Sequence, residues 1–421
     1  MMTLTQKLTL AFYQFLWLFA PFFIRFYLKK RAKKAPDYLL NWAERFGQPL
    51  AHPVSRPIWI HAVSVGETRA AQPLIKALQQ EFPDVPFLIT QMTPTGRKTA
   101  QQLYPTAQIR YLPYDKKDYI DVFLQEHKPW FGVLMETELW PNLVHQSIKQ
   151  NIPLFLANAR LSEKSFQGYK KVHTLIEPIV SQLKLICAQS EADANRFSKL
   201  GAKSVEVCGN SKYDMAIPES MYKLSEVFTQ YIGERPVVVC ASTREGEEAL
   251  LLDAWHKNET DALLVMIPRH PERFNEVYQL AQSKGFTVQK RSENSPVLHS
   301  TNIWVGDSMG ELFAYYLCAT VAFVGGSLVD VGGQNIIEPM QCAKPTLFGF
   351  STYNFSQVCA DALVNKAAIQ VYTANEWLEQ TQKLLNQLEY CQQLGQQALL
   401  FTEQFQGATK RMAQLIKANI S

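Results

Sequence analysis

Apolar and polar positions alternate along most of this chain with two different periods. From residue 57 onward, short apolar runs are separated by longer stretches in which apolar residues recur at helical spacing. After Arg69, for example, the apolar residues at 70, 71, 74, 75 and 78 share one helical face, and polar residues take the other. This pattern predicts repeated β-α-β units around parallel sheets.

The predicted strands fall into two series. The first series comprises residues 58–62, 87–90, 109–112, 132–135, 154–157, 185–188 and 205–208. The second series comprises residues 237–240, 263–267, 303–305, 321–324, 346–348 and 369–371. The stretch 209–233 breaks the rhythm between them, and the stretch from 376 onward has a helical pattern. Two series of about 170–190 residues each predict two α/β domains.

An uncharged apolar run occupies residues 8–24, which would be about 25 Å long as a helix. That length is at the short limit for crossing a bilayer. Pro21, with Tyr13, Gln14 and Trp17, is also compatible with a helix that lies in the membrane interface. A cleaved signal peptide is disfavoured, because the run has no small-residue cleavage site and a basic cluster follows it. Both remaining alternatives attach the chain to a membrane.

Positive charge is concentrated beside this run. The 421 residues include 42 Lys and Arg against 38 Asp and Glu, a net charge of +4. Six basic residues lie within ten positions, and the rest of the chain has a net charge of −2; the six are Arg25, Lys29, Lys30, Arg31, Lys33 and Lys34. A slightly acidic body disfavours nucleic-acid binding. Because Lys7 is the only charged side chain before the run, the positive-inside bias predicts that the domains lie on the cytoplasmic side.

Composition supports large buried cores, with 47% apolar and 19% charged residues in a chain too long for a single core. The seven cysteines are scattered, odd in number and without a Cys-x-x-Cys pair. This fits neither a disulfide framework nor a zinc site. We expect small core cysteines in a reducing compartment.

Loops at the carboxyl ends of parallel strands carry the chemistry of doubly wound sheets, and four such loops are distinctive. The first contains Ser64, Gly66 and Glu67 ahead of a predicted helix. Gly66 is expected to allow a sharp turn that places the Glu67 carboxylate at the helix start. Glu67 is then either an ordinary first-turn acid or a general base at a domain cleft.

The second and third loops each offer chemistry that has a rival explanation. Glu136 and Glu138 can hold a divalent cation, stabilise the start of the helix after Pro141, or bind substrate hydroxyls. Residues 306–310 match the Gly-x-Ser-x-Gly nucleophile elbow of α/β-hydrolases. That class is strongly disfavoured, because its triad needs a histidine after the serine and none of the eight histidines follows Ser308.

The fourth loop contains paired glycines at 325–326 and 332–333, ahead of a predicted helix with Glu338. Such glycines expose backbone N–H groups to a phosphate or carboxylate, although they also serve purely structural turns. Glu338 can accept hydrogen bonds from ribose hydroxyls. The pattern is neither Gly-x-Gly-x-x-Gly nor Walker A, which disfavours NAD enzymes and P-loop NTPases. Upstream, Arg269 offers a guanidinium for an anion or for a surface salt bridge.

Eight segments occur in the order and approximate spacing of one known family: WIHAVSVGET, TQMTPTGR, METELWPNL, ANARLS, ASTREGEE, PRHPERF, GDSMGEL, and FVGGSL followed by GGQN and Glu338. On these segments the chain closely resembles the 3-deoxy-D-manno-octulosonic acid (Kdo) transferases of Gram-negative bacteria. The resemblance covers the N-terminal run and nearly the whole chain.

The resemblance implies an α/β fold of the GT-B glycosyltransferase type, with two Rossmann-like domains facing a cleft and an N-terminal membrane-anchor helix. It implies inverting transfer of Kdo from CMP-Kdo to the lipid A precursor lipid IVA at the inner membrane, without a metal or other cofactor and without nucleic acid. Four parts follow: an anchor with its basic collar (1–34), an acceptor-binding domain (35–210), a linker (211–233) and a CMP-Kdo-binding domain with C-terminal helices (234–421).

The resemblance also implies residue roles, with Glu67 as the general base. The donor-binding residues are Pro268, Arg269, Met309, Gly310, Glu311, Asn335, Ile336, Ile337 and Glu338. Candidates for acceptor binding or the cleft are Ser64, Gly66, Arg97, Glu136, Glu138, Arg160, Lys164 and Lys212. Gln334 stands where the family pattern has a histidine, which leaves the role of that side chain open.

The alternative from another class is a membrane-tethered protein that binds a nucleotide sugar or lipid on the same fold without catalysis. The joint presence of Glu67, Arg269, Glu311 and Glu338 favours the enzyme.

Overall fold

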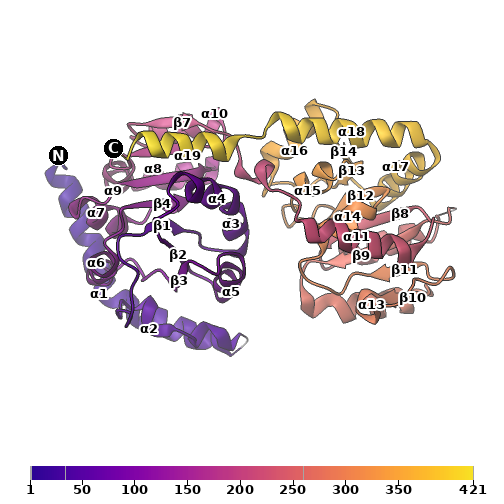
Figure 1. Cartoon of the computed structure of the whole chain (residues 1–421), viewed down its shortest axis with the longest axis horizontal. Coiled ribbons are helices and arrows are strands. Elements are labelled where there is room, and N and C mark those ends of the chain that lie inside the picture. The colour runs from indigo at the N-terminus through magenta and orange to yellow at the C-terminus, as the bar shows by residue number, and fades with distance from the viewer. Residues whose placement is uncertain (1, 34, 259, 421) are drawn as a thin grey trace. The chain divides into compact units, whose positions relative to one another are not determined.

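The computed structural model describes residues 2–33, 35–258 and 260–420, so Lys34 of the basic cluster lies outside the described residues. The chain divides into two compact units (Figure 1). The first unit extends to Met215 and also includes the segment from Gln406 onward, and the second extends from Ala216 to Phe405.

The first unit is built on a seven-stranded parallel sheet. Its strands are β1 (Ile58–His61), β2 (Phe87–Gln91), β3 (Gln108–Tyr111), β4 (Phe131–Met135), β5 (Leu154–Ala159), β6 (Leu185–Ala188) and β7 (Val205–Val207). Their order in the sheet is β3-β2-β1-β4-β5-β6-β7. Ile58 and Ile60 of β1 belong to the core on one face and Trp59 to the core on the other. Both faces are therefore buried, as is usual for parallel sheets.

Helices cover both faces of this sheet. The helices and helical turns of the first unit are α1 (Leu4–Ala32), η1 (Pro36–Leu39), α2 (Trp42–Arg45), α3 (Val65–Ala70), α4 (Gln72–Glu81), α5 (Pro94–Leu103), α6 (Lys117–His127), α7 (Pro141–Lys149), α8 (Glu163–Lys171), α9 (His173–Val180), α10 (Glu191–Lys199), η2 (Ser211–Asp214) and α19 (Ala408–Ala418). Leu74 and Leu78 of α4 pack into the core on one face, and Phe123 of α6 packs into the other.

The second unit repeats this architecture. Its strands are β8 (Val237–Thr243), β9 (Leu263–Pro268), β10 (Val288–Lys290), β11 (Ile303–Val305), β12 (Val321–Val324), β13 (Thr346–Phe348) and β14 (Ile369–Gln370), in the order β10-β11-β9-β8-β12-β13-β14 and all parallel. Its helices and helical turns are α11 (Glu219–Ile232), α12 (Glu247–Trp255), η3 (Pro271–Arg273), α13 (Phe274–Ser283), η4 (Arg291–Glu293), α14 (Leu312–Cys318), α15 (Ile337–Gln341), α16 (Ser356–Val364), α17 (Ala374–Asn386) and α18 (Leu388–Gln404).

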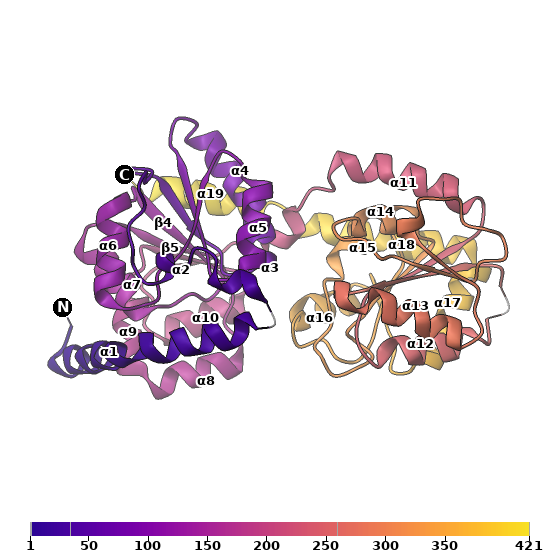
Figure 2. The same ribbon diagram turned by 90° about the horizontal axis from the view of Figure 1, so that it is seen from below.

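The N-terminal apolar run forms the central part of α1. Thr3 caps this helix, because its side chain accepts a hydrogen bond from the Gln6 N–H and its own N–H donates to the Gln6 side chain. Within the described part of the chain, α1 alone is long and apolar enough to cross a membrane, by length and composition. Figure 2 shows it as an indigo helix along one side of the first unit.

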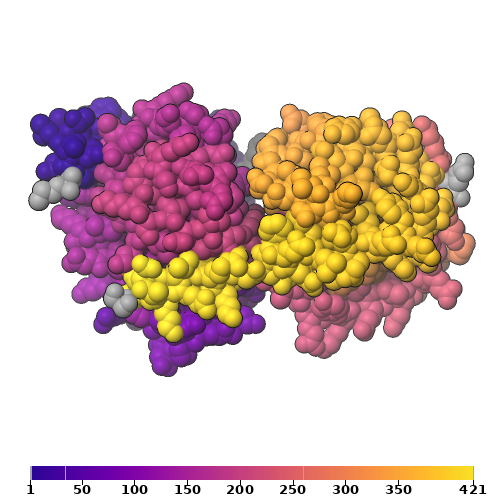
Figure 3. Space-filling model, turned by 90° about the horizontal axis from the view of Figure 1, so that it is seen from above, coloured from indigo at the N-terminus to yellow at the C-terminus, as the bar shows by residue number. Residues whose placement is uncertain are grey.

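The last helix, α19, returns to the first unit. Ala408, Met412 and Ile416 are buried in the core that contains the apolar side of α4. At the start of α19, the Asp214 carboxylate accepts hydrogen bonds of 2.6 Å from the N–H groups of Gly407 and Thr409. Figure 3 shows this C-terminal segment in yellow against the surface of the first unit.

Every strand predicted from the sequence is confirmed, with ends that differ by three residues or fewer. β10 escapes prediction, because its three partly buried residues, Val-Gln-Lys, form no apolar run. The seven cysteines are free and are buried or, for Cys318, partly buried, as expected of core residues.

Two predicted boundaries differ from the structure. The stretch 211–233 is more than a linker, because it includes η2 of the first unit and α11, whose Phe228 and Ile232 are buried in a core of the second. Assigning all of 234–421 to the C-terminal domain is wrong at its end, since the chain from Gln406 onward belongs to the first unit. Periodicity locates a helix but does not say which core receives its apolar face.

We expect Met412→Ala to destabilise the first unit by about 2–5 kcal/mol, because it removes a fully buried side chain from the core beneath α4. Amide hydrogen exchange measures this effect: protection should fall in β1 and stay unchanged in β8. Lys410→Ala, on the exposed side of the same helix, is the matched control. A loss of protection confined to β8 would contradict the assignment of α19 to the first unit.

Candidate functional site

The strand order of the first sheet reverses beside β1, since β2 lies on one side of β1 and β4 on the other. Ligands of doubly wound sheets bind at the carboxyl ends of the strands at such a switch point. The loop after β1 carries Ser64 and Glu67, and the loop after β4 carries Glu136 and Glu138. Three of the carboxylates singled out in the sequence therefore lie at the switch point of the first unit.

Glu67 is held by its own loop in the first turn of α3. Its carboxylate accepts hydrogen bonds from the Val63 N–H (2.9 Å) and from the Ser64 hydroxyl (3.0 Å). Ser64 is in turn the N-cap of α3. These contacts fix the orientation of a side chain that remains partly exposed.

Gly66 does not make the sharp turn expected of it. It is the second residue of α3, and it is absent from the glycines with positive φ. A Cβ built at this position would meet only the Ser64 hydroxyl, at 3.8 Å. The fold therefore does not demand glycine here, and the missing side chain leaves space beside Glu67.

The environment of Glu67 disfavours its charged form. Burial raises the pKa of the Glu67 carboxyl to about 8, and the carboxylates of Glu136 and, less strongly, Glu138 add to this effect. The hydrogen bonds from Val63 and Ser64 oppose it. A carboxyl with this pKa exchanges its proton near neutral pH, which is the property of a general acid or base.

The second loop holds its two acids in different ways. Glu136 adopts a left-handed backbone conformation (φ 58°), and its carboxylate lies 3.8 Å from the Lys212 ammonium. Glu138 accepts a 2.6 Å hydrogen bond from the indole N–H of Trp140, and burial raises the pKa of its carboxyl. Among the described residues, no three His, Cys, Asp or Glu side chains are arranged to hold a metal ion.

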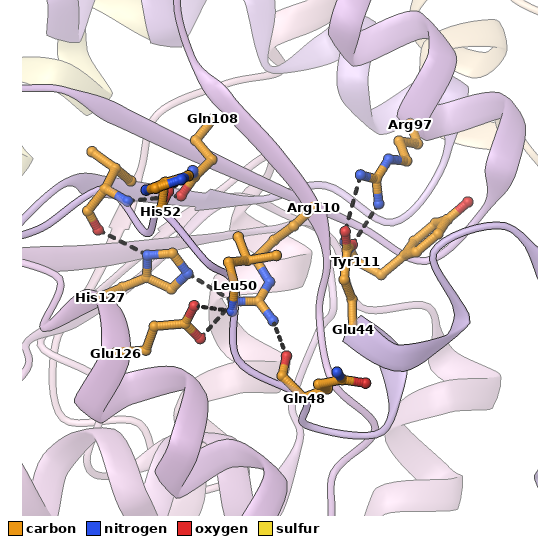
Figure 4. A network of polar contacts seen from close by, with 11 residues as sticks. Glu44, Gln48, Leu50, His52, Arg97, Gln108, Arg110, Tyr111, Glu126 and His127 are labelled. Atoms are coloured by element: carbon orange, nitrogen blue, oxygen red, sulfur yellow. Dashed lines mark hydrogen bonds and ion pairs between the residues drawn. The ribbon is translucent and has the colours of Figure 1, made fainter.

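Arg97 forms a partly buried ion pair with Glu44. Both of its terminal nitrogens contact the Glu44 carboxylate, at 2.5 and 3.1 Å (Figure 4). The ring of Tyr111 lies beneath the guanidinium groups of Arg45 (3.5 Å) and Arg97 (4.8 Å). The Glu44 carboxylate therefore balances the charge of Arg97, and Tyr111 supports both guanidinium groups.

The other cationic candidates of the first unit lie on neighbouring elements. Arg160 follows β5, and its carbonyl accepts a hydrogen bond from the Thr137 hydroxyl, which ties it to the Glu136 loop. Lys164 is exposed on α8, and Lys212 is partly buried on η2. Lys212 contacts a switch-point acid, Glu136.

The second sheet has its switch point between β8 and β12, where the contacts of residues 326–328 support the structural role that the sequence left open for the glycine-rich loop. The buried Glu247 carboxylate accepts hydrogen bonds from the N–H groups of Gly326 (2.6 Å), Ser327 (3.0 Å) and Leu328 (2.8 Å). It also accepts one from the Arg244 N–H at 3.2 Å. An acid of the protein itself thus takes the place predicted for a bound anion.

The donor-site candidates form separate groups of contacts in the second unit. β9 ends at the buried Pro268, and the next residue, Arg269, is exposed. The Nε of Arg269 donates a hydrogen bond of 3.3 Å to the side-chain oxygen of Gln334. The role left open for Gln334 therefore includes a contact with this guanidinium. The carboxamide of Asn335 donates to Glu338 at 3.2 Å.

The remaining candidates differ in how accessible they are. The Glu311 carboxylate contacts the Arg291 guanidinium (3.2 Å) and accepts from the Ser308 hydroxyl (2.6 Å), whereas the neighbouring Met309 is 61% exposed. Gly310 adopts a positive φ of 83°. The side chains of Ile336 and Ile337 are buried, so these residues can meet a ligand only through their backbone.

Sequence reasoning overlooks three residues that organise these loops: His61, Asn158 and Glu247. Burial lowers the pKa of His61 to about 3, so its ring is neutral where it packs against Trp140, 5.8 Å away between centroids. Asn158, with φ 52°, accepts a hydrogen bond from the Ser211 N–H. Each lies in a segment that carried the resemblance. For His61 and Asn158 the available signal was a polar residue within an apolar strand, and for Glu247 it was an acid at the start of a helix.

Comparison with known proteins gives consistent matches. The family model described as 3-Deoxy-D-manno-octulosonic-acid transferase (kdotransferase) matches residues 40–215. The 3-deoxy-D-manno-octulosonic acid transferase of Haemophilus influenzae is 36% identical over 91% of this chain and 92% of that protein. The transferase of the same name from Bordetella pertussis is also 36% identical, over 91% of this chain and 92% of its own length.

Solved structures share the architecture at low identity. The UDP-GlcNAc 2-epimerase of Neisseria meningitidis, bound to UDP-GlcNAc, is 16% identical, covers 87% of this chain and all of its own, and gives a TM-score of 0.62. This likeness shows the fold alone, two Rossmann-like parallel sheets of the GT-B-like type.

We expect Glu247→Ala to lower the free energy of unfolding of the second unit by at least about 3 kcal/mol, because several buried N–H groups lose their acceptor at about 1–3 kcal/mol each. Urea denaturation read by hydrogen exchange of β8 and β12 measures this loss. Glu245→Ala, which removes a side chain that is 88% exposed, is the control. Wild-type stability of Glu247→Ala would mean that these N–H groups need no internal acceptor.

Proposed function

The chain belongs to the Kdo transferase family of enzymes, and on that premise we propose that it transfers Kdo from CMP-Kdo to the lipid A precursor lipid IVA with Glu67 as the general base. The observation that carries this proposal is the carboxyl of Glu67 at the first switch point, with its pKa raised to about 8. No second function is favoured by a comparable observation.

The position of Glu67 supports its role as the base. Two hydrogen bonds from its own loop hold the carboxylate in place, and the side chain remains partly exposed to an incoming hydroxyl. The raised pKa makes the carboxylate a stronger base than an ordinary glutamate.

In the proposed reaction, Glu67 takes the proton of an acceptor sugar hydroxyl while the oxygen attacks the anomeric carbon of Kdo. The new glycosidic bond forms on the face opposite CMP, the bond from that carbon to the CMP phosphate oxygen breaks, and the configuration inverts. The bonding electrons leave with the phosphate. General-base assistance of this kind is worth about 10²–10⁴ in rate.

The proposed donor site uses the groups of the second unit. Arg269 supplies a guanidinium that can stabilise the negative charge on the departing phosphate. Asn335 and Glu338, which contact each other, offer polar atoms for the nucleotide, and Ile336 and Ile337 offer only backbone groups. Glu247 already accepts hydrogen bonds from the N–H groups of residues 326–328, so we assign the phosphate of the donor to Arg269 rather than to those groups.

The proposed location is the cytoplasmic side of the inner membrane, where the amphiphilic acceptor is held in the bilayer. The apolar helix α1 and the basic residues in its last turn support attachment to a membrane with anionic lipids.

We expect Glu67→Gln to lower the turnover of Kdo transfer by at least about 10²-fold, because the amide cannot accept the proton. Mass spectrometry of lipid IVA after incubation with CMP-Kdo measures the transfer, and its mass gain also counts the Kdo residues added. CMP affinity should be unchanged, and Asp84→Asn, at an exposed position of the same unit, should behave as wild type. Wild-type turnover of Glu67→Gln would refute the assignment of the base.

The pH dependence of transfer should follow the ionisation of Glu67. Because the base acts deprotonated and its pKa is raised to about 8, kcat/KM should rise with pH through that region. Glu136→Gln removes the neighbouring carboxylate that contributes most to the shift, so the rise should move to lower pH.

Glu138→Gln is the matched comparison, because Glu138 contributes less to the same shift and should move the profile less. A profile that stays in place in Glu136→Gln would show that the observed limb belongs to another group.

A further inference from the structure

α1 presents two distinct faces along its whole length. One face is apolar and exposed; its members include Leu4, Leu8, Phe12, Phe15, Phe19, Phe22, Phe23 and Phe26, which are 53–74% exposed. The other face packs against the first unit, and Leu10, Pro21, Leu28 and Ala32 are buried there. At about 100° per residue, these two sets lie on opposite sides of the helix.

Polar side chains fasten the first half of the packed face to the first unit. The Gln6 carboxamide donates to Glu177 of α9 at 3.0 Å, and the Tyr13 hydroxyl donates to the buried Asp115 at 2.8 Å. The Gln14 carboxamide donates to the buried Asn142 at the start of α7, also at 2.8 Å. These contacts begin two residues into the helix.

The second half is fastened by apolar and aromatic contacts. Leu28 and Ala32 form a small core with Tyr38 of η1. The guanidinium of Arg25 lies 4.7 Å from the ring centre of Phe46, and that of Arg31 lies 4.3 Å from the ring centre of Tyr38. The first unit therefore accompanies α1 from its first turn to its last.

A helix attached in this way cannot cross a bilayer alone. Its 29 residues are about 43 Å long, more than the hydrocarbon thickness of about 30 Å. If α1 stood upright with these contacts intact, the α9 region with His173 and Glu177 and the buried carboxyl of Asp115 would enter hydrocarbon, which is costly for ionisable groups. If α1 left the first unit, Asp115 would lose the hydrogen bond from the Tyr13 hydroxyl, and Asn142 would lose the one from the Gln14 carboxamide.

The charges at the end of α1 match a position on the membrane surface. Lys29, Lys30 and Lys33 are exposed and follow the apolar residues of the exposed face. Long cationic side chains at the end of an apolar face reach the headgroups of anionic lipids while that face contacts acyl chains.

We propose that α1 lies parallel to the membrane plane on the first unit, with its exposed apolar face inserted into a single cytoplasmic leaflet that contains anionic lipid. Both ends of the helix then remain on one side of the membrane. The sequence alone leaves this arrangement and a membrane-spanning helix as open alternatives, because the face that packs on the protein is apolar as well, and the helix lacks the polar side of a free amphipathic helix.

The sidedness of the N-terminus tests the proposal in the full chain. An epitope tag followed by a cleavage site for a sequence-specific protease is placed before the first residue, and the protein is expressed in a Gram-negative host. The protease should remove the tag in inverted membrane vesicles, which expose the cytoplasmic face, and leave it intact in spheroplasts. A tag reached only in spheroplasts, or from neither face, overturns the proposal.

A disulfide test addresses the packing of α1 in the membrane. The hydroxyl oxygens of Thr9 and Thr174 are 3.4 Å apart, so Thr9→Cys with Thr174→Cys should cross-link when isolated membranes are oxidised. Ala11→Cys with Thr174→Cys, at an exposed position about 200° around α1 from Thr9, should remain unlinked. The cross-linked membranes should retain Kdo transfer. If no cross-link forms, α1 does not pack on the first unit in the membrane. If the cross-linked membranes transfer Kdo more than about tenfold more slowly than unoxidised membranes, α1 must leave the first unit for the enzyme to work. Either result would overturn the proposal.

Discussion

The reversal of strand order beside the first strand of each sheet is the constraint on which the candidate site depends. In the first sheet, β2 and β3 follow β1 toward one edge, and the chain then returns to place β4 on the other side of β1. In the second sheet, β12 likewise lies beside β8, on the side opposite β9. Because all strands are parallel, the loops after each of these pairs leave the same edge of the sheet, and no helix connects the two members of a pair directly. Residues about 70–90 positions apart in the chain become neighbours for this reason.

The two switch points use carboxylates in opposite ways. In the first unit, burial and, less strongly, the neighbouring carboxylates of Glu136 and Glu138 raise the pKa of Glu67, so the site holds a carboxyl that readily takes up a proton. In the second unit, Glu247 accepts hydrogen bonds from the backbone N–H groups of the glycine-rich loop and so holds that loop in place. Burial raises the pKa of both glutamates, and they differ in their surroundings: Glu67 is partly exposed, whereas four N–H donors converge on the buried Glu247.

The apolar runs were sufficient to predict all strands except β10, because buried parallel strands are nearly continuous in hydrophobicity. The loops at their ends were sufficient to locate Glu67, Glu136 and Arg269. Their partners were not predictable in the same way: that Glu247 accepts from residues 326–328, or that Arg97 pairs with Glu44, depends on contacts between segments that sequence spacing does not connect. The destination of α19 and the partner of α1 escaped prediction for the same reason, since an apolar face does not identify what covers it.

The return of α19 to the first unit has a consequence for how the protein is made. The core face of α4 stays uncovered while the 190 residues from Ala216 to Phe405 are synthesised, because Met412 and Ile416 follow them in the chain. At about 5–20 residues per second, this interval lasts roughly 10–40 s. The first unit is therefore incomplete until α19 has been synthesised, and a nascent chain that already carries α1 must wait for that helix before its first core can close.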